Sequence, residues 1–281
     1  MGMKIKMLEF AKELARGSGA LLMEYLPKLR TIETKQTITD LVTDADRASE
    51  AWLVSQIKER YPDHLILGEE GGGNTTTPYA DGYVWVIDPL DGTVNYAHKL
   101  PIFAVSIGLM KDGEAYLGVI YIPMLDELFC AIKGGGATRN GEKIKISDRQ
   151  ILQNSVIATG FPYDKHLSER NNIENFGRFL KKIRGIRRMG AASVDLAYVA
   201  SGALDGYWEE KLKPWDIVAG GIIVKEAGGC VSGYSGNPVD WEAGHIVASN
   251  PHIHDQLLEV LSPYAIKHHL NSTRYIGENT Q

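Results

Sequence analysis

The feature that most constrains the fold of this chain is an apolar strand followed directly by acidic residues. Residues 84–93 read Val-Trp-Val-Ile-Asp-Pro-Leu-Asp-Gly-Thr. The first four residues predict a buried strand that delivers Asp88 to its C-terminal end. Pro89 then predicts a turn, within which Asp88 and Asp91 can point to the same side.

The residues around the two aspartates can complete a site for a metal and a phosphate. The Leu90 carbonyl joins the carboxylates as a hard oxygen ligand of the kind that Mg²⁺ prefers. Gly92 lets the backbone approach a ligand, and Thr93 can begin a helix whose N–H groups receive phosphate oxygens. Asp-Pro-x-Asp-Gly is also a good β-turn sequence, so this segment alone leaves a plain turn open.

Three further acidic segments lie at predicted element ends. Gly68-Glu69-Glu70 ends a short strand, residues 40–46 (Asp-Leu-Val-Thr-Asp-Ala-Asp) open a helix, and Pro214-Trp215-Asp216 opens another. Each has an ordinary explanation: solvated acids after a strand, or helix caps and acids that favour the helix dipole. Together with residues 84–91 they place carboxylates at four element ends, which a shared metal site would explain.

The hydrophobic pattern predicts two lobes built from layers of helices and sheets. The expected helices are residues 6–26, 44–60, 173–182, 192–201, 214–227 and 252–261. The expected strands are residues 65–68, 84–87, 103–110, 116–121, 128–132, 156–158, 207–208 and 246–248. The strands before residue 150 follow one another through short turns (111–114 and 139–142), so their sheet should be mostly antiparallel. Helices alternate with strands in residues 151–265, which is typical of an α/β lobe. Residues 266–281 form a polar tail, and because the chain lacks periodicity after Tyr264 we expect disorder there.

Composition narrows the class of protein. A formal net charge of −5 without a basic stripe argues against a nucleic-acid partner. No apolar run approaches the about 20 residues that a membrane span needs, and the N-terminus has no apolar signal core, so the expected location is the cytoplasm. Cys130 and Cys230 lie in apolar stretches and are expected to be buried free thiols. The basic run from Lys181 to Arg188 is either a solvated helix end or a contact for an anion.

The acidic motifs together resemble one known family. Residues 85–93 and 214–220 are similar to the two signatures of the inositol monophosphatase family. Residues 40–43, 68–70 and 226–229 also match, in the family's order, and the resemblance extends from about Leu8 to about Leu261. It implies a sugar-phosphatase-like fold of alternating α-β-α-β-α layers with two sub-lobes, an N-terminal α+β lobe carrying most metal ligands and a C-terminal α/β lobe.

The resemblance implies a set of metal ligands. Residues matching Glu69, Asp88 and the Leu90 carbonyl bind a first Mg²⁺, those matching Asp88, Asp91 and Asp216 bind a second, and a third, looser ion lies near Glu69. One ion would lower the pKa of a water that attacks phosphorus, and another would stabilise the leaving alkoxide. Mn²⁺ is a possible substitute, whereas Li⁺ and Ca²⁺ are expected to inhibit.

Catalytic and phosphate-binding roles follow from the same resemblance. The Thr93 hydroxyl would orient the attacking water, backed by Asp46, and Glu70 would help to order the metal shell. Backbone N–H groups of Gly92 and Thr93 would hold phosphate. Lys35 matches a lysine of a mobile loop, although a surface lysine is the alternative. The catalytic set is therefore Asp46, Glu69, Glu70 and Thr93.

Substrate choice depends on residues further along the chain. Glu209 matches a glutamate that contacts inositol hydroxyls, and Gly190-Ala191-Ala192 matches a loop beside the ring. The substrate-binding set is Asp91, Gly92, Thr93, Gly190, Ala191, Ala192, Glu209 and Asp216. The leading hypothesis is hydrolysis of a small polyol phosphate, and inositol 1-phosphate is the first candidate substrate. Members of this family are commonly homodimers, so a homodimer is expected.

Several alternatives stay open at this point. Arg187, Arg188 or Lys213 can meet a second phosphate, so a fructose-1,6-bisphosphatase or a broad-specificity sugar or nucleotide phosphatase of the same fold is possible. Relatives that act on adenosine 3′,5′-bisphosphate carry a different stretch where this chain has residues 192–195, and that branch is disfavoured. Val94 and Lys99 depart from the family pattern and leave only specificity in doubt. A regulatory role without catalysis is a distant alternative, because every carboxylate of the clamp is present.

Overall fold

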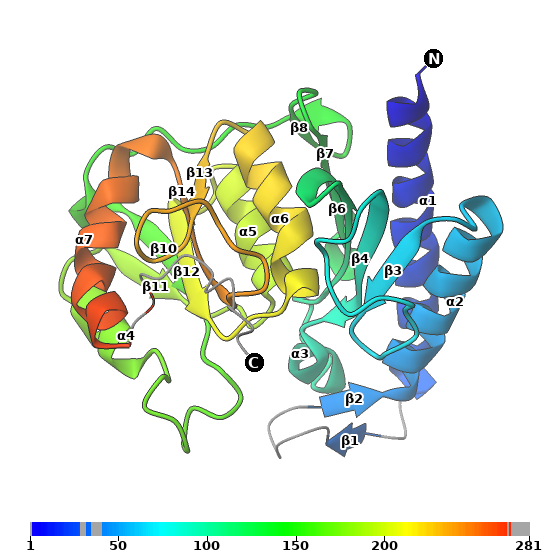
Figure 1. Ribbon diagram of the computed structural model, residues 1–281. Coiled ribbons are helices and arrows are strands. Elements are labelled where there is room, and N and C mark those ends of the chain that lie inside the picture. Colours follow the sequence, from blue (N-terminus) through cyan, green and yellow to red (C-terminus); the bar gives the residue numbers. More distant parts are fainter. Residues whose placement is uncertain (1, 29–31, 35–40, 269, 271–281) are drawn as a thin grey trace, which may run out of the picture.

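The computed structural model describes residues 2–28, 32–34, 41–268 and 270 (Figure 1). Its helices are α1 (Met3–Tyr25), α2 (Asp44–Arg60), α3 (Thr93–Ala97), α4 (Ile173–Leu180), α5 (Ala192–Ala200), α6 (Pro214–Glu226) and α7 (Pro251–Lys267). A seven-stranded sheet has the order β3 (Leu65–Gly68), β4 (Tyr83–Asp91), β5 (Ala104–Lys111), β6 (Glu114–Ile122), β7 (Glu127–Ile132), β8 (Ala137–Arg139) and β9 (Glu142–Lys143). A five-stranded sheet has the order β11 (Gly185–Arg187), β10 (Val156–Thr159), β12 (Gly206–Glu210), β14 (His245–Ser249) and β13 (Cys230–Ser232). Strands β1 (Ile32–Thr34) and β2 (Leu41–Thr43) form a separate pair.

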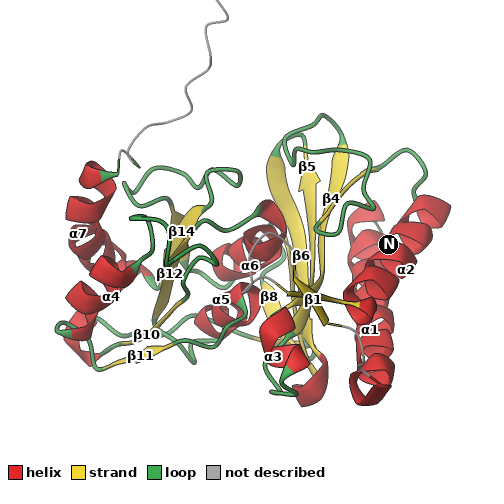
Figure 2. Ribbon diagram, turned by 90° about the horizontal axis from the view of Figure 1, so that it is seen from below, coloured by secondary structure: helices red, strands yellow, loops and turns green. Residues whose placement is uncertain are grey.

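The two large sheets and the helices stack in five layers. Helices α1 and α2 cover one face of the seven-stranded sheet, and α5 and α6 lie between the two sheets (Figure 2). Helices α4 and α7 cover the outer face of the five-stranded sheet. This arrangement confirms the expected alternation of α-β-α-β-α layers.

Strand pairing agrees with the sequence. In the seven-stranded sheet only β3 and β4 are parallel, and every other neighbouring pair is antiparallel. In the five-stranded sheet β10 runs parallel to β11 and β12, as expected for strands separated by helices. The two predicted hairpin turns are confirmed, with positive φ at Asp112 and Gly113 and at Asn140 and Gly141. Helix α7 extends to Lys267, six residues past its predicted end, and residues 271–281 lie outside the described part.

The predicted turn at Pro89 is wrong in one respect, because β4 continues through it. Asp88 pairs with Ser106 and Asp91 pairs with Ala104, so three steps along β4 face two steps along β5. This irregularity is a bulge. It arises where Pro89 has no N–H to give to the sheet, and the Leu90 N–H donates to Asp88 Oδ1 instead, at 2.9 Å. The bulge replaces the chain reversal and re-aims the side chains that follow Asp88.

Two glycines let α6 approach the seven-stranded sheet closely. A Cβ at Gly118 on β6 would lie 2.3 Å from the Ala219 carbonyl oxygen of α6, and a Cβ at Gly108 on β5 would lie 2.6 Å from Val218 Cγ1. Because α6 begins at Pro214, this approach fixes the depth at which Asp216, in its first turn, stands beside the end of β4. The glycines therefore set the distance between the two acidic segments.

The two cysteines agree only in part with the prediction of buried free thiols. Neither cysteine forms a disulfide; Cys130 is buried as expected, whereas Cys230 is only half-buried, so that part of the prediction is wrong. It is half-buried because β13, which carries Cys230, is an edge strand of its sheet.

Within the described ranges, no helix combines the length and the apolar character that a membrane crossing requires.

His64 should make the stability of the fold depend on pH. Its ring stacks between Tyr61 and Tyr83, and its Nδ1 accepts a hydrogen bond from Trp85 Nε1 at 3.0 Å. Burial lowers the pKa of His64, and the Asp63 charge only partly opposes this. The folded protein therefore binds fewer protons than the unfolded chain below the ordinary histidine pKa of about 6.5, and its free energy of unfolding falls as pH falls through that value.

The His64→Asn variant isolates this effect, because asparagine offers an acceptor and does not titrate. Urea unfolding at pH 7.5 and pH 5.5 should show that the wild type loses more free energy of unfolding than the variant between the two conditions. Equal losses would contradict the assignment of this pH dependence to His64.

Candidate active site

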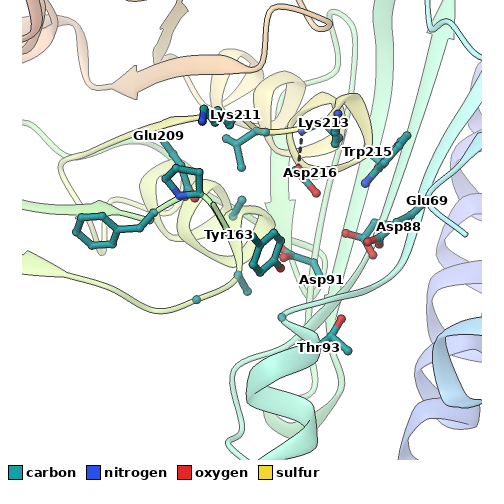
Figure 3. A pocket seen from close by; sticks show the side chains of 18 of the residues that line it. Glu69, Asp88, Asp91, Thr93, Tyr163, Glu209, Lys211, Lys213, Trp215 and Asp216 are labelled. Carbon is teal, nitrogen blue, oxygen red and sulfur yellow. Dashed lines mark hydrogen bonds between the residues drawn. The ribbon is translucent and has the colours of Figure 1, made fainter. Parts of the chain in front are cut away.

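A pocket of about 500 Å³ opens where β4, α3, α5, β12 and α6 meet (Figure 3). This volume is in the range of small-molecule sites. The predicted residues that line it are Glu69, Asp88, Leu90, Asp91, Gly92, Thr93, Gly190, Ala191, Ala192, Glu209 and Asp216. Segments separated by more than a hundred residues of chain therefore meet in one cavity, as the sequence motifs predicted.

Four carboxylates gather on the β4 side of the pocket. Asp88 is almost completely buried, with 2% of its surface exposed. Burial raises the pKa of Asp88 well above its usual range, and the nearby charges of Glu69, Asp91 and Asp216 raise it further. Burial likewise raises the pKa of Asp216, with Asp91 and Glu69 adding to the effect. These groups repel one another in a place where water screens them poorly.

Hydrogen bonds orient two of these carboxylates. Asp91 Oδ2 accepts from the Ser193 backbone N–H at 2.7 Å and from the Ser193 hydroxyl at 2.5 Å, at the beginning of α5. Burial raises the pKa of Asp91, and the two bonds from Ser193 work against that shift. Asp216 Oδ2 accepts from the Lys213 N–H at 2.6 Å. Lys213 is therefore the cap of α6 and Asp216 is its third residue, which corrects the expectation that Asp216 itself caps the helix.

The cluster suits a hard cation in its chemistry. Its donors are carboxylates and the Leu90 carbonyl, and no histidine or cysteine is among the residues that line the pocket. Within the described part of the chain, however, no three acidic, histidine or cysteine side chains converge closely enough to hold an ion as they stand. Burial raises the pKa of Asp88, and the repulsion from the neighbouring carboxylates raises it further. A divalent cation would relieve that repulsion, so the residues fit an oxygen-liganded metal.

Thr93 and Asp46 form a hydrogen bond next to the carboxylate cluster of the pocket. The Thr93 hydroxyl lies 3.2 Å from Asp46 Oδ1 and 3.1 Å from the Leu90 carbonyl oxygen. Asp46 Oδ2 accepts from the N–H and the hydroxyl of Thr43, the cap of α2. Asp46 is fully buried and does not line the pocket. Asp46 therefore takes part in the cap of α2 and also contacts Thr93, so both expectations for Asp46 are correct.

Glu70, like Asp46, does not line the pocket. Its backbone N–H donates to Glu50 Oε2 at 2.8 Å. Glu50, a buried residue of α2 that the sequence reasoning missed, also accepts from the Gly72 N–H and so fixes the loop that follows Glu69. Lys35 lies outside the described residues.

The opposite side of the pocket is built around Glu209, at the end of β12. Burial raises the pKa of Glu209 to about 7, while the hydrogen bond from the Tyr207 hydroxyl, 2.6 Å long, and the charge of Arg188 oppose the shift. Of the three cations considered for a second phosphate, Arg188 and Lys213 line the pocket and Arg187 does not.

The sequence assigned no role in the site to the other lining residues. They are Gly160, Phe161, Pro162, Tyr163, Asp164, Glu210, Lys211, Leu212 and Trp215. Ser193 was missed as well, although it follows directly after the Gly190–Ala192 segment. Leu212 and Trp215 lie between Glu209 and Asp216 in the sequence, which was a usable signal, whereas residues 160–164 carry no motif that points to a site.

Comparisons with known proteins give matches over almost the whole chain. A sequence model of the "Inositol monophosphatase family" matches residues 3–265. An "Inositol-1-monophosphatase" of Synechocystis sp. is 44% identical over 91% of this chain and 88% of its own length. A "Nus factor SuhB" of Pseudomonas aeruginosa is 41% identical over 92% of this chain and 96% of its own length. The solved structure of an inositol monophosphatase from Anabaena (Nostoc) superimposes with a TM-score of 0.83 at 44% identity, covering 92% of this chain and 96% of that one.

Proposed function

The chain belongs to the inositol monophosphatase family, a family of phosphatases, and from this premise we propose that it is a Mg²⁺-dependent phosphomonoesterase that acts on a small polyol phosphate. Inositol 1-phosphate is the first candidate substrate. The observation that carries the proposal is the buried carboxylate cluster that opens into a pocket beside Thr93 and Glu209.

The family is generally metal-dependent, and the site offers a matching set of ligands. Glu69, Asp88, Asp91, Asp216 and the Leu90 carbonyl would hold two to three ions. A bound Mg²⁺ supplies two things to phosphate-ester hydrolysis, namely a water of lowered pKa and electrostatic stabilisation of the leaving oxygen.

Thr93 and Asp46 would place the attacking water. The Thr93 hydroxyl can donate its one hydrogen bond to Asp46 Oδ1 or to the Leu90 carbonyl oxygen, and either choice leaves the lone pairs of the hydroxyl oxygen to accept a hydrogen bond from water. Because Asp46 is also held by Thr43, its position is rigid and the hydroxyl is aimed before substrate arrives. The backbone N–H groups of Gly92 and Thr93, at the start of α3, would bind the phosphate oxygens.

The Glu209 side of the pocket would bind the alcohol part of the substrate. Its carboxylate can accept hydrogen bonds from vicinal hydroxyls, and the Gly190–Ala192 segment would lie along the ring. Arg188 and Lys213 line the same cavity, so fructose 1,6-bisphosphate, with its second phosphate, is the alternative substrate that a specific observation supports.

A substrate panel tests this proposal. Phosphate release should require Mg²⁺, stop when EDTA is added and return when Mg²⁺ is restored in excess. The panel compares inositol 1-phosphate, fructose 1,6-bisphosphate, adenosine 3′,5′-bisphosphate and NADP, and we expect the highest kcat/KM for inositol 1-phosphate. Mn²⁺ should replace Mg²⁺ in part, and Li⁺ and Ca²⁺ should inhibit. Full activity in EDTA would contradict the metal-dependent reaction. A higher kcat/KM for fructose 1,6-bisphosphate than for inositol 1-phosphate would contradict inositol 1-phosphate as the preferred substrate.

A second role beside catalysis is supported by the relatives named Nus factor SuhB. We propose that this chain can also act as a regulatory protein that contacts the transcription machinery. A homodimer is the further assembly we expect. A phosphatase-dead variant separates the regulatory role from catalysis, as described in the Discussion.

A further inference from the structure

One wall of the pocket comes from the segment that joins β10 to α4, residues 160–172. Gly160, Phe161, Pro162, Tyr163 and Asp164 of this segment line the cavity, although none belongs to an acidic motif. The wall begins directly against Glu209, because a Cβ at Gly160 would lie 2.1 Å from Glu209 Oε2. The segment is therefore in the right place to contact the alcohol part of a substrate.

Tyr163 reaches furthest into the pocket from this wall. Figure 3 shows its ring turned toward the interior of the pocket, in the direction of Asp91, on the side away from Glu69 and Asp88. The side chain is 48% exposed, so its aromatic surface is accessible to a ligand in the cavity. An aromatic ring can pack against the C–H face of a cyclic polyol, which an open-chain polyol does not present.

A lysine holds this wall in place. Lys211 Nζ donates to Asp164 Oδ2 at 2.7 Å and to Ser168 Oγ at 2.8 Å. Ser168 in turn accepts from the Arg170 backbone N–H at 3.2 Å, so the lysine fixes the middle of the segment. Lys211 lies in the connection between β12 and α6, and hence between Glu209 and Asp216. The same stretch of backbone thus carries a proposed substrate contact, the anchor of the wall and a proposed metal ligand.

The backbone of Lys211 indicates that its side chain is required there. Its φ is 60°, in the left-handed region that glycine adopts freely and that costs other residues free energy. A lysine at such a position is strained unless the contacts of its side chain compensate. The two hydrogen bonds to the wall are contacts of that kind.

The ends of the wall are tied down separately. Asn172 Nδ2 donates to the Gly160 carbonyl oxygen at 2.7 Å, and Trp208 Nε1 donates to Asn172 Oδ1 at 2.8 Å. Arg170 Nε lies 3.2 Å from Oε2 of Glu210, a fully buried residue of β12. Between these fixed ends, the hydrogen bond from Lys211 holds Asp164, the residue that follows Tyr163, and so contributes to the position of Tyr163.

We propose that Tyr163 is a specificity-determining residue that favours cyclic polyol phosphates, and that Lys211 is the positioning residue that holds Tyr163 in the pocket through Asp164. The inference rests on the proposed phosphatase function and goes beyond it, because it assigns the choice of the alcohol part to a wall that carries no motif. Neither residue takes part in the bond cleavage.

The test compares two secondary phosphate esters that differ in the ring, inositol 1-phosphate and glycerol 2-phosphate. Tyr163→Ala should raise KM for inositol 1-phosphate about three- to tenfold, as expected for the loss of one aromatic contact, and should change kcat for this ester and KM for glycerol 2-phosphate less than about twofold. Tyr163→Phe keeps the ring and should behave as the wild type. An equal rise of KM for both esters, or no rise for either, would overturn the role of Tyr163.

A double-mutant cycle tests the positioning role. Lys211→Met should raise KM for inositol 1-phosphate selectively, and Lys211→Met combined with Tyr163→Ala should be no worse than Tyr163→Ala alone, because both changes remove the same contact. Effects that multiply in the double variant would overturn the link between the two residues. Asp164→Ala breaks the same tie from the other side and replaces Lys211→Met if that variant loses stability.

Lys165→Met is the matched control, because it makes the same lysine-to-methionine change within the wall itself and Lys165 does not line the pocket. It should leave both KM values unchanged, and a selective rise of KM for inositol 1-phosphate would show that charge alone causes the effect and would overturn the proposal. The outcomes also separate the two levels of inference. A wild type that hydrolyses neither ester would overturn the proposed function and this inference with it. A wild type that hydrolyses both, with a Tyr163→Ala variant that keeps the same ratio of KM values, would overturn this inference alone.

Discussion

Replacing Asp91 by asparagine is expected to lower kcat/KM for inositol 1-phosphate about a thousandfold, which corresponds to about 4 kcal/mol of lost transition-state stabilisation. Asp91 lines the pocket among the repelling carboxylates, and it is the proposed ligand that is also aligned by α5 through Ser193. Asparagine has nearly the same shape, and its carbonyl oxygen can still accept from Ser193. The variant therefore removes charge from the site with little change in packing.

The same change should not destabilise the metal-free protein. Neutralising Asp91 removes one of the charges that raise the pKa of Asp88 and Asp216, so the melting temperature without metal should stay equal or rise. Isothermal titration with Mg²⁺ should show the loss of affinity directly. Asp112→Asn is the matched control, because it makes the same chemical change at a hairpin residue with positive φ, which asparagine tolerates. Undiminished activity of Asp91→Asn would contradict the metal-clamp mechanism.

The inactive variant also tests the proposed regulatory role. If that role is independent of catalysis, RNA polymerase should be retained equally by immobilised wild type and by Asp91→Asn. Retention by neither protein would contradict a contact with the transcription machinery. Retention by the wild type alone would show that the contact depends on an intact carboxylate site.

Replacing Gly118 by valine is expected to lower the free energy of unfolding by about 3 kcal/mol, the upper part of the range for an overpacked core. Gly118 lies in the middle of β6, and its added Cβ would meet the Ala219 carbonyl oxygen at 2.3 Å. Backbone of a packed helix cannot rotate away as a side chain can. The variant should therefore push α6 outward, displace Asp216 and reduce Mg²⁺ affinity as well as stability.

The sign of this effect is informative, because valine is a better strand residue than glycine. Local propensity alone predicts that Gly118→Val stabilises the protein, so urea unfolding distinguishes the two influences. Gly177→Ala in α4 serves as control: apart from its chain neighbours and the nearby backbone of α4 itself, no atom lies within 4 Å of its added Cβ, and it should raise the free energy of unfolding by about 0.5–1 kcal/mol. An unchanged stability of Gly118→Val would show that α6 can retreat without loss.

Much of the site could be predicted from the sequence because its carboxylates lie at the ends of strongly patterned elements. The apolar run before Asp88, the capped helix after Thr43 and the proline at the start of α6 each have local signals. The family signatures then related residues that are far apart in the chain. Residues 160–164 have no such signal, and their place beside Glu209 is a consequence of tertiary packing.

The sequence by itself determined the longer helices and strands and which of their ends are acidic, because periodicity and capping depend on residues close together in the chain. The short strands β1, β2, β8, β9, β11 and β13 were not predicted. It also predicted that an acidic site would form around residues 88–93. Only the tertiary structure decided that Pro89 lies in a bulge of a continuing strand, that Gly108 and Gly118 admit α6, and that Lys211 holds a wall over the pocket. The bulge depends on how β4 pairs with β5, whereas the contacts of Gly108, Gly118 and Lys211 join segments more than forty residues apart in the chain. Contacts between such distant segments leave no periodic pattern in the residues that make them.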